Sequence, residues 1–229
     1  MAVAVASPRG TFDQVSELTD HPVPVSPEAL SDLLAETCLA AVGGTGSGRL
    51  RVALDGADAA EPGRLADRLV EPLRAGGVAA VRVSAGDFLR PASLRWEFGK
   101  TDPDSFYSSW LDTGALTREV LTPWAEGGRY LPAFWDAGTD RSARADYRPV
   151  PPRAVLLVDG PLLLGHGLPF DLSVHVRLSP GALRRRTPAD EAWTLPAFVR
   201  YEEEVAPGAI ADVVVRADDP RHPAVIVRG

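Results

Sequence analysis

Two chemically important residue types are scarce in this sequence. Lys100 is the only lysine among 24 basic residues, and Cys38 is the only cysteine among 229 residues. A single cysteine excludes a disulfide framework and a zinc site built from several cysteines. Because arginine supplies every other basic side chain, a reaction that needs a catalytic lysine has one candidate in this chain.

Long apolar runs and an excess of positive charge are absent as well. No run approaches the roughly 20 apolar residues that a membrane span needs. The segment 1–7 is too short for a signal-peptide core and lacks a basic start. Acidic residues number 31 against 24 basic ones, a formal net charge of −7, which argues against a partner bound through nucleic-acid phosphates. We therefore expect a cytoplasmic protein with neither a membrane nor a nucleic-acid partner.

Hydrophobic residues make up 45% of the sequence, enough for a sizeable core. From residue 49 onward, short apolar stretches alternate with helical patterns, which is typical of a parallel sheet covered by helices on both faces. The expected strands are 50–55, 79–84, 154–158, 172–178, 212–216 and 225–227. The expected helices are 62–74, 113–121, 180–187 and 190–205, with 86–110 irregular and 123–153 a long connection.

The chain divides at a glycine-rich stretch. Residues 1–48 are expected to form an extension with one helix, opened by Ser26 as a cap and Pro27 at the first helical position, and residues 49–229 the main domain. The stretch 43–48 contains four glycines and resembles a phosphate-binding loop in composition. Because it precedes a strand and does not follow one, a flexible linker is the favoured interpretation.

Three loops follow expected strands at the edge where parallel sheets bind ligands. The first reads Asp-Gly-Ala-Asp-Ala-Ala-Glu-Pro-Gly-Arg-Leu over 55–65, the second Ser-Ala-Gly-Asp-Phe-Leu-Arg over 84–90, and the third ends the apolar stretch 155–160 with Asp-Gly. Each pattern alone is weak. Their order and spacing resemble the uridine kinase family of P-loop phosphotransferases, and segments 102–106, 133–141, 177–186, 200–207 and 211–215 extend the resemblance.

This resemblance covers roughly residues 49–227. It implies an α/β fold, a P-loop kinase-like three-layer domain with a central, mainly parallel sheet and helices on both faces. It also implies ATP and Mg²⁺ as cofactors, and a nucleoside or related small hydroxyl compound as phosphoryl acceptor. A homo-oligomer is left open.

The phosphate loop departs from the family pattern G-x-x-x-x-G-K-[ST], in which lysine reaches the phosphates and the hydroxyl holds Mg²⁺. Aligned from Gly56, the chain has Glu61, Pro62 and Gly63 in place of the second glycine, the lysine and the hydroxyl residue. Arg64 either replaces the lysine two residues late or lies on the solvated face of its helix. The resemblance assigns nucleotide binding to Gly56, Ala57, Asp58, Ala59, Ala60, Gly63 and Arg64.

Four other residues have candidate catalytic roles implied by the resemblance. Asp87 would accept the proton of the substrate hydroxyl, although it lies one position later than the family's acid, and the alternative is that it caps a turn. Asp159 would hold Mg²⁺, or else form a simple Asp-Gly turn. Arg184 and Arg185, in a run with Arg186, would clamp the transferred phosphoryl group.

The substrate side is expected in two segments. The resemblance places the base and ribose near Asp104, Phe106, Trp135, Asp136, Asp140 and Arg141. A tryptophan can stack on a base and a carboxylate can accept from ribose hydroxyls, whereas loop aromatics can also simply pin a loop to the domain.

Two functions of different kinds follow. The first is ATP-dependent phosphorylation of a nucleoside-like alcohol, with Arg64, Asp87 and Asp159 in the roles above. The second is a protein of the same fold that has lost phosphoryl transfer and acts as a ligand sensor or partner-binding module. A dinucleotide-binding oxidoreductase is disfavoured because no G-x-G-x-x-G follows the first strand of the main domain.

Overall fold

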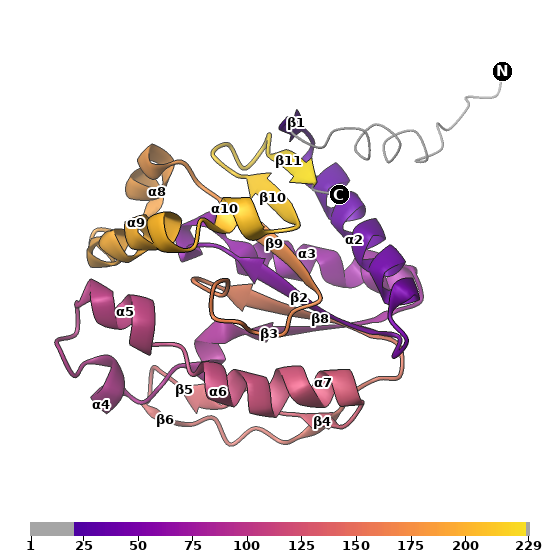
Figure 1. Ribbon diagram of the computed structural model, residues 1–229, viewed down its shortest axis with the longest axis horizontal. Helices are drawn as coiled ribbons and strands as arrows, with labels where there is room; N and C mark the ends of the chain where they lie inside the picture. Colours follow the sequence, from indigo (N-terminus) through magenta and orange to yellow (C-terminus); the bar gives the residue numbers. More distant parts are fainter. Residues whose placement is uncertain (1–20, 228–229) are drawn as a thin grey trace.

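The structure, a computed structural model, describes residues 21–227 (Figure 1). Residues 1–20 of the expected extension and residues 228–229 lie outside this range. The main strands are β2 (Arg49–Asp55), β3 (Ala79–Ser84), β8 (Ala154–Gly160), β9 (Leu172–Arg177), β10 (Val213–Arg216) and β11 (Ala224–Val227), with β1 (Val23–Pro24) at the edge. The helices flanking them are α2 (Pro27–Gly44), α3 (Pro62–Ala75), α6 (Thr113–Leu116), α7 (Thr122–Glu126), α8 (Pro180–Arg186), α9 (Leu195–Glu204) and α10 (Pro207–Ile210).

The seven strands form one sheet in the order β1-β11-β10-β9-β2-β8-β3. The five strands from β10 to β3 are parallel, while β11 and β1 pair antiparallel at one edge. The strand β2 lies between β8 and β9, so three buried strands end side by side. This confirms the mainly parallel sheet expected from the apolar stretches.

Helices cover both faces of this sheet and create two cores (Figure 1). Alternate residues of β8 face opposite sides: Leu157 packs into the core beneath α2 and α3, whereas Leu156 packs into the core beneath α6 and α7. A π-helical turn, η3 (Thr117–Leu121), joins α6 to α7. The result is the three-layer arrangement expected for this sequence.

Helix α2 packs against the main domain. The Ser26 side chain accepts a hydrogen bond from the amide of Ala29 at 3.1 Å, as expected for a helix cap. Leu34 and Cys38 are each 1% exposed and lie in the same core as α3 and strand β2. Burial raises the pKa of the Cys38 thiol to about 12, which makes it a packed, unreactive group. The boundary at residue 48 therefore marks no break in the core.

The two segments expected to be irregular contain regular structure. Segment 86–110 holds η2 (Ala85–Phe88), α4 (Ala92–Arg95) and α5 (Pro103–Ser109), and Asp102 caps α5 by accepting from the amide of Ser105 at 2.7 Å. Segment 123–153 holds two small antiparallel pairs, β4 (Arg129–Tyr130) with β7 (Arg148–Pro149) and β5 (Trp135–Asp136) with β6 (Arg141–Ser142). The expectation was wrong for these elements because they are only two to seven residues long, too short to show a clear apolar period.

The packing of α2 can be tested by truncating one buried side chain. We expect Leu34→Ala to lower the free energy of unfolding by about 2–5 kcal/mol, because it leaves a cavity between α2 and the sheet. Urea denaturation of the full chain measures the change. The control Leu94→Ala, at a side chain that is 49% exposed, should change stability by less than about 1 kcal/mol. Equal effects of the two substitutions would contradict the packing described here.

Candidate functional site

The carboxyl ends of the parallel strands gather polar residues at one edge. In the sheet register Asp55 of β2 pairs with Gly160 of β8 and with His175 of β9, and Ser84 of β3 pairs with Asp159 of β8. Asp55 is fully buried, and Asp159 and His175 are about 95% buried. Buried polar groups need partners, and these residues find different ones.

Asp159 is bound by an arginine from the neighbouring strand. Nε of Arg82 donates to Oδ1 of Asp159 at 2.6 Å, and Nη2 donates to Oδ2 at 3.0 Å. Nη1 of the same guanidinium donates to both oxygens of Asp67 on α3, at 2.9 and 3.1 Å. The hydrogen bonds to Asp159, ahead of the opposing effect of burial, raise the pKa of Arg82. The fork geometry makes this a bidentate, charge-assisted pair.

Gly63 borders this pair. A Cβ atom at position 63 would lie 2.9 Å from Oδ2 of Asp159 and closer still to Nη2 of Arg82, in both cases nearer than real Cβ atoms approach other atoms. The second residue of α3 must therefore be glycine as long as Arg82 spans Asp159 and Asp67. The glycine where the family has Ser or Thr is thus explained by its neighbours.

Asp55 anchors a different network that the sequence analysis did not predict. Its Oδ2 lies 2.6 Å from Nδ1 of His175, and its Oδ1 accepts from the amide of Leu163 at 2.8 Å. The hydroxyl of Tyr201 on α9 accepts from the amide of Leu164 at 3.0 Å. Burial first, and then the charge of Asp55, raises the pKa of Tyr201. This network fixes the loop after β8 and helix α9 beneath the predicted phosphate loop.

The predicted phosphate loop folds as a short 3₁₀ helix, η1 (Asp58–Ala60). The amide of Gly56 donates to the carbonyl of Gly160 at 3.1 Å, that of Ala60 to Ala57 at 2.7 Å, and that of Glu61 to Asp58 at 2.9 Å. Glu61 has φ 57°, a left-handed conformation uncommon for a residue other than glycine. These three amides are therefore bonded within the protein.

Negative charge also surrounds this loop. Asp58 is exposed and lines a cleft. Partial desolvation, followed by the charges of Glu191 and Asp159, raises the pKa of its carboxyl group. The Arg64 side chain is 65% exposed, and its guanidinium pairs with the carboxylate of Glu61 at 3.2 Å. The structure thus places Arg64 on the solvated face of α3. Lys100 lies over the ring of Trp96, 4.8 Å from its centroid, far along the chain from this loop.

The predicted arginine clamp lies on α8. Arg184 and Arg185 are exposed, and Arg186 donates from Nη2 to the carbonyl of Asp218 at 2.8 Å. The described contacts therefore bring one of the three arginines to the loop before β11, and none of them to Asp159.

A cleft of about 170 Å³ lies beyond the ends of β3 and β8. Its lining includes two acids, Asp58 and Asp159, and three aromatic residues, Phe106, Tyr107 and Trp110. Ser84, Gly86, Ser108 and His166 add to the wall. Small-molecule sites typically combine apolar walls with a few convergent polar groups, and this cleft has that composition.

Asp87 lies in the loop after β3, next to this cleft. Desolvation, followed by the charge of Asp159, raises its pKa, while the guanidinium of Arg82 lowers it. Its carbonyl accepts from the amide of Phe134 at 2.9 Å. The charges of Asp159 and Arg82 therefore act in opposite directions on this carboxyl group.

Helices α5 and α9 meet beside the cleft. Arg200 of α9 donates to Asp104 at 3.1 Å and to Glu204 at 2.8 Å, and the hydroxyl of Tyr107 donates to Glu204 at 3.0 Å. Rings of Phe106, Trp110, Trp193 and Phe198 pack edge to face or tilted within 6 Å. Asp104 therefore serves the contact between the two helices, whereas Phe106 both joins this contact and lines the cleft.

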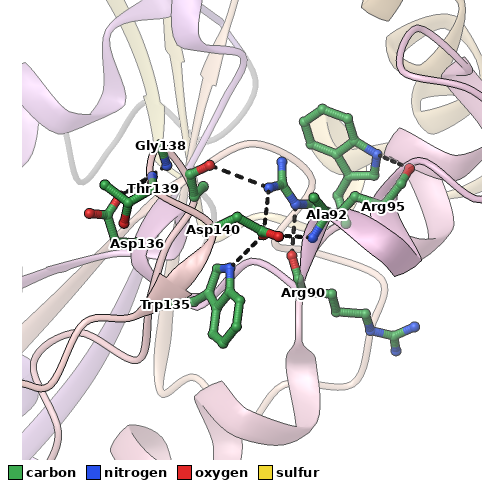
Figure 2. A network of polar contacts seen from close by, with 10 residues as sticks. Arg90, Ala92, Arg95, Trp135, Asp136, Gly138, Thr139 and Asp140 are labelled. Carbon is green, nitrogen blue, oxygen red and sulfur yellow. Dashed lines mark hydrogen bonds and ion pairs between the residues drawn. The ribbon is translucent and has the colours of Figure 1, made fainter.

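The remaining predicted substrate residues hold a loop together (Figure 2). Oδ1 of Asp140 accepts from the amide of Ala92 at 2.7 Å and from Nε1 of Trp135 at 3.1 Å, and it lies 3.7 Å from Nη2 of the buried Arg95. Asp136 accepts from the amides of Gly138 and Thr139 in a turn. Arg141 is exposed on β6. None of Trp135, Asp136, Asp140 and Arg141 lines the described cleft beside Asp159.

Solved structures show how this architecture relates to known proteins. The chain matches a protein described as a possible uridine kinase from Bacillus stearothermophilus with a TM-score of 0.63 and 23% identity, over 80% of this chain and 96% of that chain. A candidate fructose transport system kinase from Silicibacter sp. TM1040 matches with a TM-score of 0.53 and 21% identity, over 75% and 88% of the two chains. The YGR205w protein matches with a TM-score of 0.59 and 12% identity, over 90% of this chain and 100% of that chain.

The chain has a P-loop kinase-like fold. This confirms the fold class expected from the sequence. No protein-family model matches the sequence, and no curated protein matches it significantly. At 12–23% identity the structural likeness shows the fold alone, so function has to be argued from this chain's own residues.

The residues present do not fit the Mg²⁺ and ATP phosphates that the fold family implies. Both oxygens of Asp159 are bound by Arg82, and no group of three or more His, Cys, Asp or Glu side chains within residues 21–227 is arranged to hold a metal ion. The amides of Ala60 and Glu61 are bonded within the phosphate loop, which carries two acids of its own. The geometry of this P-loop kinase-like fold therefore disfavours conventional binding of a metal-bound triphosphate.

The dependence of Gly63 on Arg82 can be measured as a coupling. We expect Gly63→Ala to destabilise the protein by about 1–3 kcal/mol, because the added methyl group overlaps the guanidinium. In an Arg82→Gln background the shorter side chain leaves room, so the added cost of Gly63→Ala should fall by at least about 1 kcal/mol. Urea denaturation of the four chains closes the double-mutant cycle. Additive effects would show that Arg82 does not determine the residue at position 63.

Proposed function

We propose that the chain is a uridine kinase-like protein that binds a small nucleoside-like alcohol in the cleft between α5 and the loops after β3 and β8, without conventional Mg²⁺-ATP phosphoryl transfer. The observation that carries this proposal is that Arg82 occupies both oxygens of Asp159 while the cleft beside it remains open. The predicted metal ligand is thus bound by the protein's own arginine, and a cleft lined by carboxylates and aromatic rings lies beside it. This corresponds to a ligand sensor or partner-binding module built on a kinase fold.

The chemistry of the cleft favours a ligand that combines a planar ring with hydrogen-bond donors. Phe106 and Trp110 offer apolar ring surface, which suits a planar base. The carboxylate of Asp58 can accept hydrogen bonds from sugar hydroxyls. Its negative charge would repel a phosphorylated ligand. An uncharged nucleoside therefore fits better than a nucleotide.

The walls of the cleft are fixed by contacts that need no ligand. Arg200 connects α9 to Asp104 of α5, and its guanidinium lies 4.4 Å from the centroid of the Tyr107 ring. The Asp55 network fixes the loop that carries Gly160 and Pro161 on the opposite side. Such preorganisation reduces the conformational cost of binding. It supports a protein that recognises its ligand in the form seen here.

Binding in the cleft can be tested with a blocking substitution. Isothermal titration calorimetry of the full chain with uridine, cytidine, adenosine and uridine monophosphate should show heat for at least one nucleoside and weaker binding of the monophosphate. Ser108→Trp should weaken nucleoside binding at least tenfold, because Ser108 is an exposed lining residue and an indole there would fill the cleft. The matched control Ser142→Trp, at an exposed position on β6 outside the cleft, should bind as the wild type does.

Three results would refute this proposal. They are no heat with any nucleoside, preference for the nucleotide, and equal loss of binding in the Ser108 and Ser142 variants.

A second candidate function, phosphoryl transfer by an unconventional route, is favoured by the raised pKa of Asp87. A general base works best when its pKa approaches the operating pH, and desolvation beside Asp159 moves Asp87 in that direction. The candidate also requires a phosphate site that the loop described above does not supply.

The pH dependence of ADP release distinguishes this second candidate. If Asp87 is the base, turnover with ATP and a nucleoside should fall as pH drops through the raised pKa, because only the ionised carboxylate accepts a proton. Asp87→Asn should then lower kcat at least about 100-fold. Absence of ADP release at every pH, or turnover that survives Asp87→Asn, would eliminate this role of Asp87.

A further inference from the structure

We propose that the guanidinium of Arg82 is a built-in replacement for the divalent metal ion of this fold, and that Arg82 and Gly63 together make the site metal-independent. This inference goes beyond the proposed ligand binding, because it concerns the ion at Asp159 and stands or falls without any nucleoside. It starts from the contacts of one arginine with two acids.

The buried charge of Asp159 needs a partner. Asp159 is an acid at the end of a buried strand, with its side chain 6% exposed, and such a group needs a cation or several hydrogen-bond donors close by. Arg82 supplies both: one positive charge, and two N–H groups aimed at the two oxygens. A divalent ion would have to displace a bidentate pair whose geometry is already satisfied.

The Arg82 guanidinium also fills the space beside position 63. The Arg82 side chain crosses from β3 over the start of α3, because Nη1 reaches Asp67 one turn into that helix. The guanidinium therefore passes over position 63, where the family pattern has a hydroxyl residue that holds the metal. Any side chain at position 63 would overlap the guanidinium or Asp159. The missing hydroxyl and the added arginine are two parts of one arrangement.

Acidic groups surround the ion pair. Asp58 lines the same cleft as Asp159, and Asp67 contacts the same guanidinium, so three carboxyl groups share this edge. Arg82 supplies the positive charge that Asp159 contacts directly. The acids that would attract a divalent ion remain, while the guanidinium occupies the oxygens that would bind it. Removal of Arg82 should therefore expose an acidic site to metal ions.

A gain of metal binding tests this proposal directly. The probe is Mn²⁺ alone, detected through the relaxation of water protons, with Mg²⁺ as competitor and the full chain as protein. Wild type should show no Mn²⁺ binding that depends on Asp159. The double variant Arg82→Gln with Gly63→Ser should bind Mn²⁺ at least tenfold more tightly than wild type, since glutamine is shorter and serine adds a hydroxyl ligand. Adding Asp159→Asn should abolish that gain.

A matched control uses the same substitutions elsewhere. Arg74→Gln with Gly46→Ser changes an exposed arginine that pairs with Glu71 on α3 and a glycine with open space around its Cβ position. This variant should bind Mn²⁺ as wild type does.

The proposal is overturned if wild type binds Mn²⁺ through Asp159. It is also overturned if the folded double variant gains no Mn²⁺ binding, or gains no more than the control. If the double variant does not fold, the Mn²⁺ affinity of Arg82→Lys tests the proposal. Lysine keeps the charge but lacks the planar fork, so Mn²⁺ affinity should rise by at least threefold over wild type, and an unchanged affinity would overturn the proposal.

Discussion

The ion pair between Arg82 and Asp159 is the interaction on which the rest of this site depends. It joins adjacent strands β3 and β8 at their carboxyl ends, and through Asp67 it joins both to the first turns of α3. The bulk of the Arg82 guanidinium requires a glycine at position 63. Arg82 also supplies the positive charge that the buried Asp159 needs. In this kinase-like fold the pair therefore lies at the residue for which the resemblance of the sequence predicted a metal-holding role.

The two buried acids at this edge of the sheet, Asp55 and Asp159, have different partners. Asp55 fixes the loop after β8 and contacts His175 of β9, while Asp159 is held by Arg82. The predicted phosphate loop is bonded to itself and to Gly160. What remains open is the cleft on the α5 side, with aromatic rings and carboxylates on its walls. The protein's own contacts thus engage Asp159 and the predicted phosphate loop, and they leave this cleft beside them.

The sequence predicted the sheet and the helices well because apolar stretches and helix caps are local signals. The 155–160 stretch and the Ser26 cap illustrate this. It also located the loops that surround the site, including Asp159. The partners of these residues could not be predicted, since Arg82 reads as an ordinary polar residue of a strand, and its contact with Asp159 depends on strand order. The assignments of Trp135, Asp136 and Asp140 to a substrate followed family position, whereas their hydrogen bonds serve the loop itself.

The most direct measurement is the nitrogen-15 NMR signal of the Arg82 Nε–H group in the full chain, assigned by its loss in Arg82→Lys. One Nε–H signal should exchange slowly with water, as expected for a donor held against the buried Asp159 carboxylate, and it should stay unchanged when Mg²⁺ and ATP are added in excess. A signal that exchanges as fast as those of the exposed arginines, or that moves or disappears when Mg²⁺ is added, would contradict the claim that this guanidinium occupies the site.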